Sequence, residues 1–383
     1  MISFFKKLKL KLQFTGWLQY LLPLVIVIIF LIAVSIIWMF ELMIFANLFL
    51  GTSSLLFAIT LFDILTVKYD IRPREKLSKR YEGMDEFDLM RARRSCRSFQ
   101  SRLLTSSDRE ELLETSQKFH ASESDKIGAH AIRFEYINAR LTVWPVVGAQ
   151  EFLVAIVPKA YSRKSVIDVG RNLQKIVHHA TRMGLASCWI GPGADQESIA
   201  LQLGDRFKAS EDHIICVCAF GYKSWFTPIT LRIASFIQHK RLPISSLFFT
   251  DPLLKEPISE LVYPFNLFGR CYEVCQWAPS SFNAQPTRCV AVMETDEENE
   301  KEHNLPATIN ESGLLRFDFY ATTSSRYYAP VALGIWCANW EIGCEALGVN
   351  GHFELLSEKQ RNISKMPINR ETSKYDVSWV LDK

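Results

Sequence analysis

The chain has 383 residues, of which 48% are hydrophobic and 22% are charged, and its 44 basic and 41 acidic residues give a formal net charge of +3. This composition is typical of a globular protein, and the length allows one large domain or two ordinary ones. Because the charges nearly balance and no long basic run occurs beyond the first 80 residues, the sequence argues against nucleic acid as a partner, which would require a concentrated basic face.

The first predicted elements are two apolar segments, over residues 16–40 and 42–65, separated by the single charge of Glu41. Each is at least as long as the roughly 20 residues that a helix needs to cross a bilayer. A cleaved signal peptide would have a shorter apolar core and a small-residue cleavage site, so that interpretation is disfavoured. Residues 1–66 are predicted to form a membrane hairpin. The alternative is one long bent helix or a re-entrant pair, because the connecting loop would be very short.

Basic residues flank both ends of this pair. Four lysines precede it, and six lysines and arginines follow it between residues 68 and 80, within a basic linker at 67–90. Since basic flanks stay on the cytoplasmic side, we expect a two-span membrane protein whose soluble part faces the cytoplasm or an equivalent reducing compartment. The nine cysteines agree with that expectation, because they fall mostly inside apolar runs and are interpreted as buried, reduced thiols.

Beyond the linker, apolar residues at helical spacing alternate with short strand-like runs, which predicts an α+β fold class. The first half, residues 91–254, is predicted to contain a helix at 106–119, strands at 131–139, 151–158 and 213–222, and a long amphipathic helix at 168–183 that ends at Gly184 before a short strand. The second half, residues 255–383, is predicted to contain a helix at 265–279, a strand at 288–295 and a second long helix at 326–349 that ends at Gly348.

Pairs of cysteine and histidine do not form a metal-binding pattern. Cys271 and Cys275 are a CxxxC pair with no second pair nearby, whereas a structural zinc site draws on two such pairs. His178 and His179 are about 100° apart on a helix, so their side chains face different ways. We therefore expect no metal.

An arginine-rich segment follows the linker, where residues 91–99 read RARRSCRSF. Several guanidinium groups and a hydroxyl that converge on one point suit a phosphate monoester, because charge-assisted bidentate hydrogen bonds are strongest there. The alternative is a basic juxtamembrane stretch that contacts anionic lipid and continues the linker. Composition alone does not decide between these two interpretations.

Four motifs resemble those of the nitroreductase-like FMN flavoproteins. Residues 93–99, RRSCRSF, resemble the RRSxRxF opening of that family, and residues 277–286, WAPSSFNAQP, resemble its APSxxNxQPW. Asp168-Val-Gly170, followed by GLASCWIG at 184–191, is similar to the family's DxG helix and GLxxxxIG strand. Residues 239–242, HKRL, are similar to its late basic pair. Together the matches extend over most of the soluble part.

The order of these motifs differs from the usual one. In the family, APSxxNxQPW lies between RRSxRxF and the DxG helix, but here residues 100–167 contain no such sequence and the motif comes after HKRL. Ordinary members are homodimers that hold each FMN between the first motif of one subunit and the second motif of the other. The chain thus resembles the nitroreductase subfamily in which a single chain mimics the dimer. The resemblance implies a nitroreductase-like fold as a fused pseudo-dimer, with one flavin site per chain.

The resemblance assigns FMN-binding roles to residues of both halves. The phosphate and ribityl end is assigned to Arg93, Arg94, Ser95 and Arg97, together with Lys240 or Arg241. The isoalloxazine ring is expected along Trp189, Ile190 and Gly191. The residues expected to approach the flavin from the other half are Pro279, Ser280, Ser281, Asn283 and Gln285. One position departs from the motif, because Thr287 stands where the family has tryptophan.

The function that this resemblance implies is a membrane-anchored, FMN-dependent oxidoreductase. It would take hydride from NAD(P)H and reduce a nitroaromatic, quinone-like or related small acceptor, and by analogy with the membrane-anchored iodotyrosine deiodinases the acceptor could be a halogenated compound. No catalytic protein residue is expected, because the flavin carries the chemistry and the protein orients it.

The alternative is a non-catalytic accessory subunit, with or without flavin, tethered to other proteins of a membrane assembly. The departure at Thr287 and the aromatic stretch at 247–265 favour that alternative.

Overall fold

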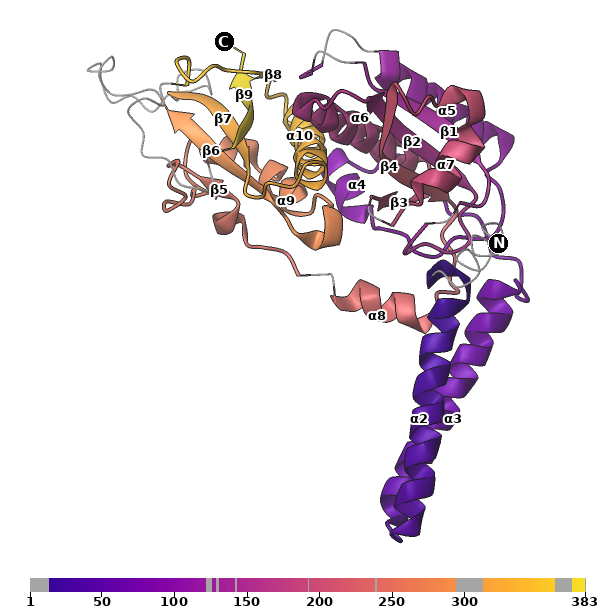
Figure 1. Cartoon of the computed structure of the whole chain (residues 1–383). Coiled ribbons are helices and arrows are strands. Elements are labelled where there is room, and N and C mark those ends of the chain that lie inside the picture. The colour runs from indigo at the N-terminus through magenta and orange to yellow at the C-terminus, as the bar shows by residue number, and fades with distance from the viewer. Residues whose placement is uncertain are drawn as a thin grey trace.

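The computed structural model describes residues 14–121, 126–128, 131–141, 143–191, 193–237, 240–293, 313–361 and 374–382. The α-helices within these ranges are α2 (Gln19–Met39), α3 (Met43–Asp63), α4 (Glu86–Ala92), α5 (Ser106–Ala121), α6 (Arg163–Arg182), α7 (Gln196–Leu203), α8 (Ile229–Ile237), α9 (Cys271–Gln276) and α10 (Tyr328–Ala346). The strands are β1 (Arg133–Asn138), β2 (Glu151–Pro158), β3 (Ala186–Ile190), β4 (Asp212–Gly221), β5 (Phe248–Phe249), β6 (Thr287–Met293), β7 (Leu314–Ala321), β8 (Gly351–Glu354) and β9 (Tyr375–Leu381). A pair of long helices extends from two mixed halves (Figure 1).

The two N-terminal helices are long and apolar enough to cross a membrane, over Gly16–Met39 and Met43–Lys68. They lie side by side and turn back at Glu41, which has a positive φ of 56° (Figure 1). The hydroxyl groups of Thr52 and Thr60 donate to backbone carbonyls four residues earlier, at 2.8 and 2.7 Å. Polar groups with partners inside their own helix suit a hydrocarbon environment.

The first half is built on a four-stranded antiparallel sheet with the strand order β1-β2-β4-β3. β2 is buried almost throughout, because helix α6 covers one face and a second apolar cluster covers the other. The helices and strands predicted for this half are confirmed, but α6 begins earlier than expected, at Arg163. The reason is an N-cap, in which the Ser162 hydroxyl accepts from the Ser165 N–H at 3.3 Å.

The second half contains a five-stranded sheet with the order β5-β6-β7-β9-β8, in which only the β5–β6 pair is parallel. Its core is aromatic. The centroid of the Trp340 ring lies 4.7 Å from that of Phe317 and 6.0 Å from that of Trp379. The predicted strand and the second long helix are confirmed as β6 and α10. The predicted helix at 265–279 is wrong as a single element. It is divided into a short 3₁₀ helix and α9, because Gly269 has a positive φ of 44°.

The structure places two boundaries differently from the sequence prediction. β5 pairs with β6, and Phe248 lies in the core of the second half, so that half begins before residue 255. The predicted linker at 67–90 contains most of α4, which the Asp85 carboxylate caps by accepting from the Asp88 N–H at 2.8 Å. Phe87 and Met90 of α4 pack into the second core, so α4 precedes the first half in sequence but belongs to the second in space.

The two halves meet where α6 crosses α10 with their backbones in contact. A Cβ added to Gly170 would lie 2.3 Å from a backbone oxygen of α10, and one added to Gly334 would lie 2.0 Å from the Ile167 oxygen. Glycine is therefore required on both helices at the crossing. Beside it, the buried Arg171 donates to both carboxylate oxygens of Glu341 at 2.9 and 2.6 Å. One long helix from each half forms this central contact, as a fused pseudo-dimer requires.

Candidate functional site

The RRSCRSF segment lies directly after α4 and runs beside the first sheet. The Cys96 N–H donates to the Ser187 oxygen at 2.8 Å, which holds the segment against the start of β3. Farther along, the Phe99 N–H donates to the Val147 oxygen at 2.9 Å, and the Phe99 ring is buried. Backbone hydrogen bonds thus fix this segment, while its arginine side chains line a cavity between the two halves.

The cavity has a volume of about 220 Å³. That is many times the roughly 10–15 Å³ that one water molecule needs, so it has the size for an organic ligand. Four arginine residues line the cavity and, among the residues that the structure describes, no carboxylate does. The predicted site residues that line it are Arg93, Arg94, Ser95, Arg97, Trp189, Ile190, Gly191, Arg241, Pro279, Ser280, Ser281 and Asn283. Residues from both halves are therefore brought together at one place.

Arg93 is the buried member of this arginine group. The residue is 7% exposed, and its Nη1 atom has no hydrogen-bond partner within the described part of the chain. Burial, together with the nearby positive charges of Arg241 and Arg94, lowers the pKa of Arg93 to about 10. A buried guanidinium with an unpaired donor and positive neighbours is costly in free energy. An anion in the cavity would offset that cost.

The ring of Trp277, in the second half, contacts three arginine side chains of the first half. The centroid of its ring lies 4.6 Å from the guanidinium of Arg91, 5.1 Å from that of Arg94 and 5.5 Å from that of Arg241. These distances fall within the range of cation–π contacts. Arg241 also donates to the Ala278 oxygen at 2.9 Å, and burial lowers its pKa to about 10. The WAPSSFNAQP motif of the second half therefore positions arginine side chains that belong to the first half.

The loop that follows Trp277 has an unusual backbone. Phe282, Asn283 and Gln285 have positive φ angles of 51°, 55° and 46°. Residues with side chains rarely adopt these angles, least of all bulky ones such as Phe282, and strain of this kind persists at ligand-binding sites. A hydrogen bond from the Gln285 N–H to the Ser280 hydroxyl, at 2.9 Å, closes the loop.

Two predicted site residues lie outside the cavity lining. Gln285 accepts from the Leu242 N–H at 2.8 Å and donates to the Lys240 oxygen at 3.1 Å, and the Lys240 side chain is exposed. Asn283 lines the cavity, but its side-chain amide donates to the same Lys240 oxygen at 2.6 Å. Both amides thus position the segment that carries Arg241. The first residue of the HKRL motif, at 239, lies outside the described residues.

Five aromatic residues that line the cavity were not among the predicted site residues: Trp277 and Phe282 lie inside the WAPSSFNAQP motif, and Trp144, Tyr327 and Tyr328 lie outside every motif. A Cβ added to Gly191 would lie 3.4 Å from the Tyr328 ring, so the glycine of the first half meets an aromatic residue of the second. Tyr327 stacks on His213 with 5.0 Å between ring centroids. Two adjacent tyrosines at the start of a long helix are a signal that could have indicated the pair, but Trp144 lies in a loop with no recognisable motif.

The chain belongs to the nitroreductase family whose sequence model is described as "Putative TM nitroreductase", which matches residues 86–302. That range is more than half of the chain and includes α4, the arginine segment and the WAPSSFNAQP loop. No curated protein matches the chain.

Solved structures with some likeness to this chain also come from nitroreductases. A "putative nitroreductase" from Thermotoga maritima is 14% identical and covers 81% of this chain and 100% of its own, with a TM-score of 0.45. A nitroreductase with bound FMN from Bacteroides fragilis is 17% identical and covers 37% of this chain and 89% of its own, with a TM-score of 0.30. An FMN-dependent nitroreductase from Clostridium difficile is 17% identical and covers 36% of this chain and 86% of its own, with a TM-score of 0.29. Because these identities and TM-scores are low, the assignment to the family depends on the match of residues 86–302 to the family model.

Proposed function

We propose that this protein is a membrane-anchored oxidoreductase that binds one FMN per chain in the cavity between its halves. The observation that carries the proposal is the buried Arg93, whose Nη1 atom has no partner among the described residues, in a cavity lined by four arginines. Such a site calls for an anion, and a phosphate monoester is the anion that guanidinium groups bind best. Membership of a nitroreductase family makes FMN the phosphate that fits.

The other residues of the cavity also fit this cofactor. The indole N–H of Trp189 is buried and has no hydrogen-bond partner within the described ranges, so it offers a donor to a ligand with ring acceptors. Aromatic rings of Trp144 and Tyr328 supply apolar surface from opposite halves. The arginines of the cavity would hold the phosphate, and Trp189, Trp144 and Tyr328 would contact the ring system.

When bound, FMN supplies the two-electron chemistry, and the residues of the chain bind, orient and exclude water. Overall, NAD(P)H, one proton and an acceptor give NAD(P)⁺ and the acceptor reduced by two electrons. The acceptor class that we propose is a nitroaromatic, quinone-like or related small molecule.

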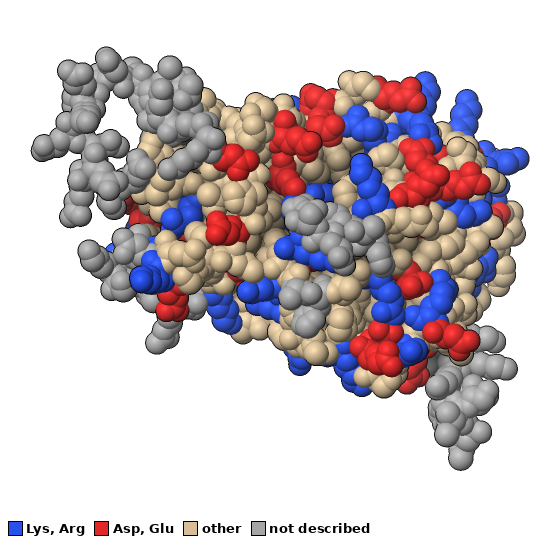
Figure 2. All heavy atoms as spheres, turned by 90° about the horizontal axis from the view of Figure 1, so that it is seen from above, with Lys and Arg blue, Asp and Glu red and all other residues tan. Residues whose placement is uncertain are grey.

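The two N-terminal helices support the anchoring part of the proposal, because their length and apolarity suit a bilayer. The face of the protein away from these helices carries interspersed acidic and basic side chains, as expected of a surface in water (Figure 2). We propose a two-span anchor with this face in the cytoplasm or an equivalent reducing compartment, where the nine buried cysteines are free thiols.

The test is an absorption spectrum of the full-length protein purified in detergent, with flavin quantified per chain and NADH or NADPH then added without oxygen. About one FMN per chain, bleached by a nicotinamide cofactor, is the expected result. A protein that stays colourless and takes up no added FMN would refute the proposal and favour the accessory-subunit alternative.

A pair of variants sharpens this test. Arg97→Ala should lower the flavin content, because it removes a charge-assisted contact of about 1.5–3 kcal/mol. Arg206→Ala is the matched control, since that arginine lies on the surface of the first half and pairs with Glu135 at 3.1 Å. Equal flavin contents in the two variants would remove Arg97 from the site.

A further inference from the structure

Helix α8 is fixed to the end of α3, the second of the two N-terminal helices. Its first residue, Ile229, donates its N–H to the Asp63 carboxylate at the end of α3, at 2.8 Å. Just before α8, the Phe226 ring lies 6.0 Å from Phe62 of α3. In Figure 1, α8 lies crosswise at the end of the helix pair and extends toward the second half. Its position relative to the pair is therefore set at its N-terminus.

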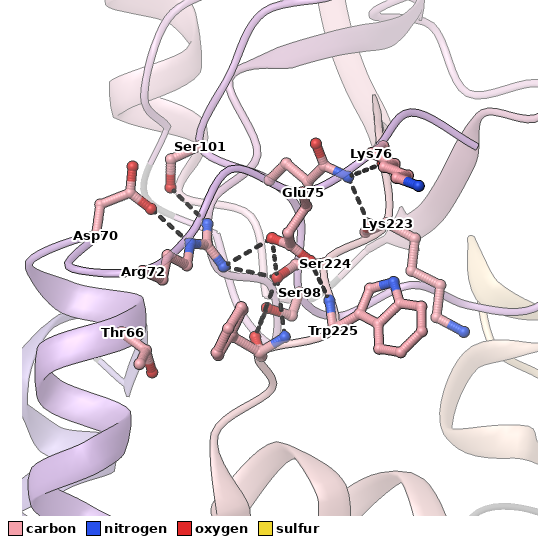
Figure 3. A network of polar contacts seen from close by, with 12 residues as sticks. Thr66, Asp70, Arg72, Glu75, Lys76, Ser98, Ser101, Lys223, Ser224 and Trp225 are labelled. Atoms are coloured by element: carbon pink, nitrogen blue, oxygen red, sulfur yellow. Dashed lines mark hydrogen bonds and ion pairs between the residues drawn. The ribbon is translucent and has the colours of Figure 1, made fainter.

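A buried polar network strengthens this attachment (Figure 3). The guanidinium of Arg72, in the segment that leaves the helix pair, donates to the Ser224 hydroxyl at 2.6 Å and lies 3.3 Å from the Glu75 carboxylate. The same carboxylate accepts from the Trp225 N–H at 2.5 Å. The side chains of Arg72 and Glu75 are 6% and 8% exposed. Figure 3 shows how this network joins the exit from α3 to the turn that enters α8.

The outer face of α8 is apolar. Ile229, Ile233 and Phe236 are spaced as one helical face, and Ile233 and Phe236 are 55% and 82% exposed. Trp225, which directly precedes the helix, is 84% exposed. A surface helix of a soluble protein presents polar residues outward, so the pattern here is inverted. Arg232 is exposed beside this face, as is usual where a helix meets lipid headgroups.

The opposite face of α8 forms part of the cavity. Leu231 is fully buried, and Ser235, one turn later, lines the cavity. The Ser235 hydroxyl accepts from the Arg97 guanidinium at 2.7 Å. A helix with its side chains is about 10 Å across, so the cavity lies one helix width from the outer face of α8.

We propose that α8 is an interfacial helix whose outer face inserts into the bilayer surface, so that the cavity takes a lipophilic electron acceptor dissolved in the membrane. This inference rests on the proposed function and narrows its acceptor class. With a quinone as the acceptor, NAD(P)H and one proton reduce it to the quinol, which returns to the lipid. The occupant of the apolar face is lipid, because the face continues directly from the end of α3, where the helix pair would leave the bilayer.

The decisive experiment measures whether α8 touches lipid in the full-length protein. Because the nine native cysteines are buried, Phe236→Cys provides one exposed thiol for a bimane label. The matched control is Leu201→Cys, because Leu201 lies on α7 and is 79% exposed. In Figure 1, α7 lies in the first half, above the end of the helix pair. Both proteins are reconstituted in vesicles of phosphatidylcholine and phosphatidylglycerol that contain nitroxide lipids labelled near the headgroup.

The expected result is that the label at Phe236→Cys loses most of its fluorescence, whereas the label at Leu201→Cys keeps it. If the protein floats with the vesicles but both labels behave alike, the inference fails while the proposed anchoring stands. If the protein does not float with the vesicles, both fail.

A kinetic readout tests the acceptor class independently. Phe236→Glu places a charge on the inserted face, so the KM for a long-chain quinone supplied in vesicles should rise several-fold. Reduction of ferricyanide, which is soluble in water, should not change, and Leu201→Glu should affect neither reaction. An unchanged KM for the vesicle quinone in Phe236→Glu would overturn the proposed entry from the membrane.

Discussion

Replacing Arg93 by methionine is expected to stabilise the flavin-free protein and to weaken its binding of FMN. The residue is 7% exposed and its Nη1 atom lacks a partner among the described residues, so the folded protein bears the cost of a desolvated donor. Removing that donor should raise the free energy of unfolding by about 1–3 kcal/mol. The lost contact to phosphate should cost about 1.5–3 kcal/mol of binding, which is roughly a ten- to hundredfold weaker affinity.

The assay is a pair of measurements on the same preparations, a thermal melt of the flavin-free protein and a titration with FMN. Arg94→Met is the matched control, because Arg94 is exposed and already donates to the Arg93 oxygen at 3.1 Å. It should lose FMN affinity without any gain in stability. A flavin-free Arg93→Met protein that melts below the wild type, or that binds FMN equally well, would refute the reasoning.

Three further predictions follow from the site and the helix crossing. Asn283→Ala should release the segment that carries an arginine of the cavity and lower FMN occupancy in the same single site, as flavin analysis can show; two flavins per wild-type chain would contradict the shared site. Gly334→Ala should destabilise the protein by about 3 kcal/mol or more, because its Cβ would lie 2.0 Å from the Ile167 oxygen, whereas Gly51→Ala meets nothing within 4 Å and should not lower the denaturation midpoint. Burial lowers the pKa of His213 below its ordinary value of 6.5, so below pH 6.5 the unfolded chain binds more protons and stability should rise with pH up to that value. Denaturation midpoints across this range should lose part of that rise in His213→Gln, and an identical pH dependence would contradict the assignment.

Hydrophobic spacing predicted the two long helices and the strands of the first sheet, but it left β7 and β9 of the second sheet unpredicted. The apolar run of β2 and the helical spacing of α6 and α10 each indicate one element, and a glycine marks the end of both long helices. The prediction failed at Gly269, where a single residue with positive φ divides the expected helix. It also failed for α4, whose partners are some 200 residues away and leave no trace in local sequence. Contacts between residues this far apart in the chain cannot be predicted from the local pattern of a single sequence.

The motifs were sufficient to predict which residues of the two halves line one cavity, except Gln285 and Lys240. Arg93 and Asn283 were expected in one site although nearly 200 residues separate them, because motif order indicated a fused dimer. Gln285 was expected to approach the flavin, but its side-chain amide bonds to the backbone of Leu242 and Lys240 instead, and of the alternatives Lys240 and Arg241 it is Arg241 that lines the cavity. Tyr328 was not predicted as a site residue, because an aromatic residue at the start of a helix is more often part of a hydrophobic core than of a binding site.

The packing of α4 has a consequence for how the chain is made. Phe87 and Met90 leave the ribosome soon after the helix pair, but the core that they enter includes Trp340 and Trp379, close to the end of the chain. At roughly 5–20 residues per second, tens of seconds pass before those partners are synthesised. During that time Phe87 and Met90 cannot reach their final environment, so the nascent chain must keep these two apolar side chains of α4 unburied until the partners in the second half have been synthesised.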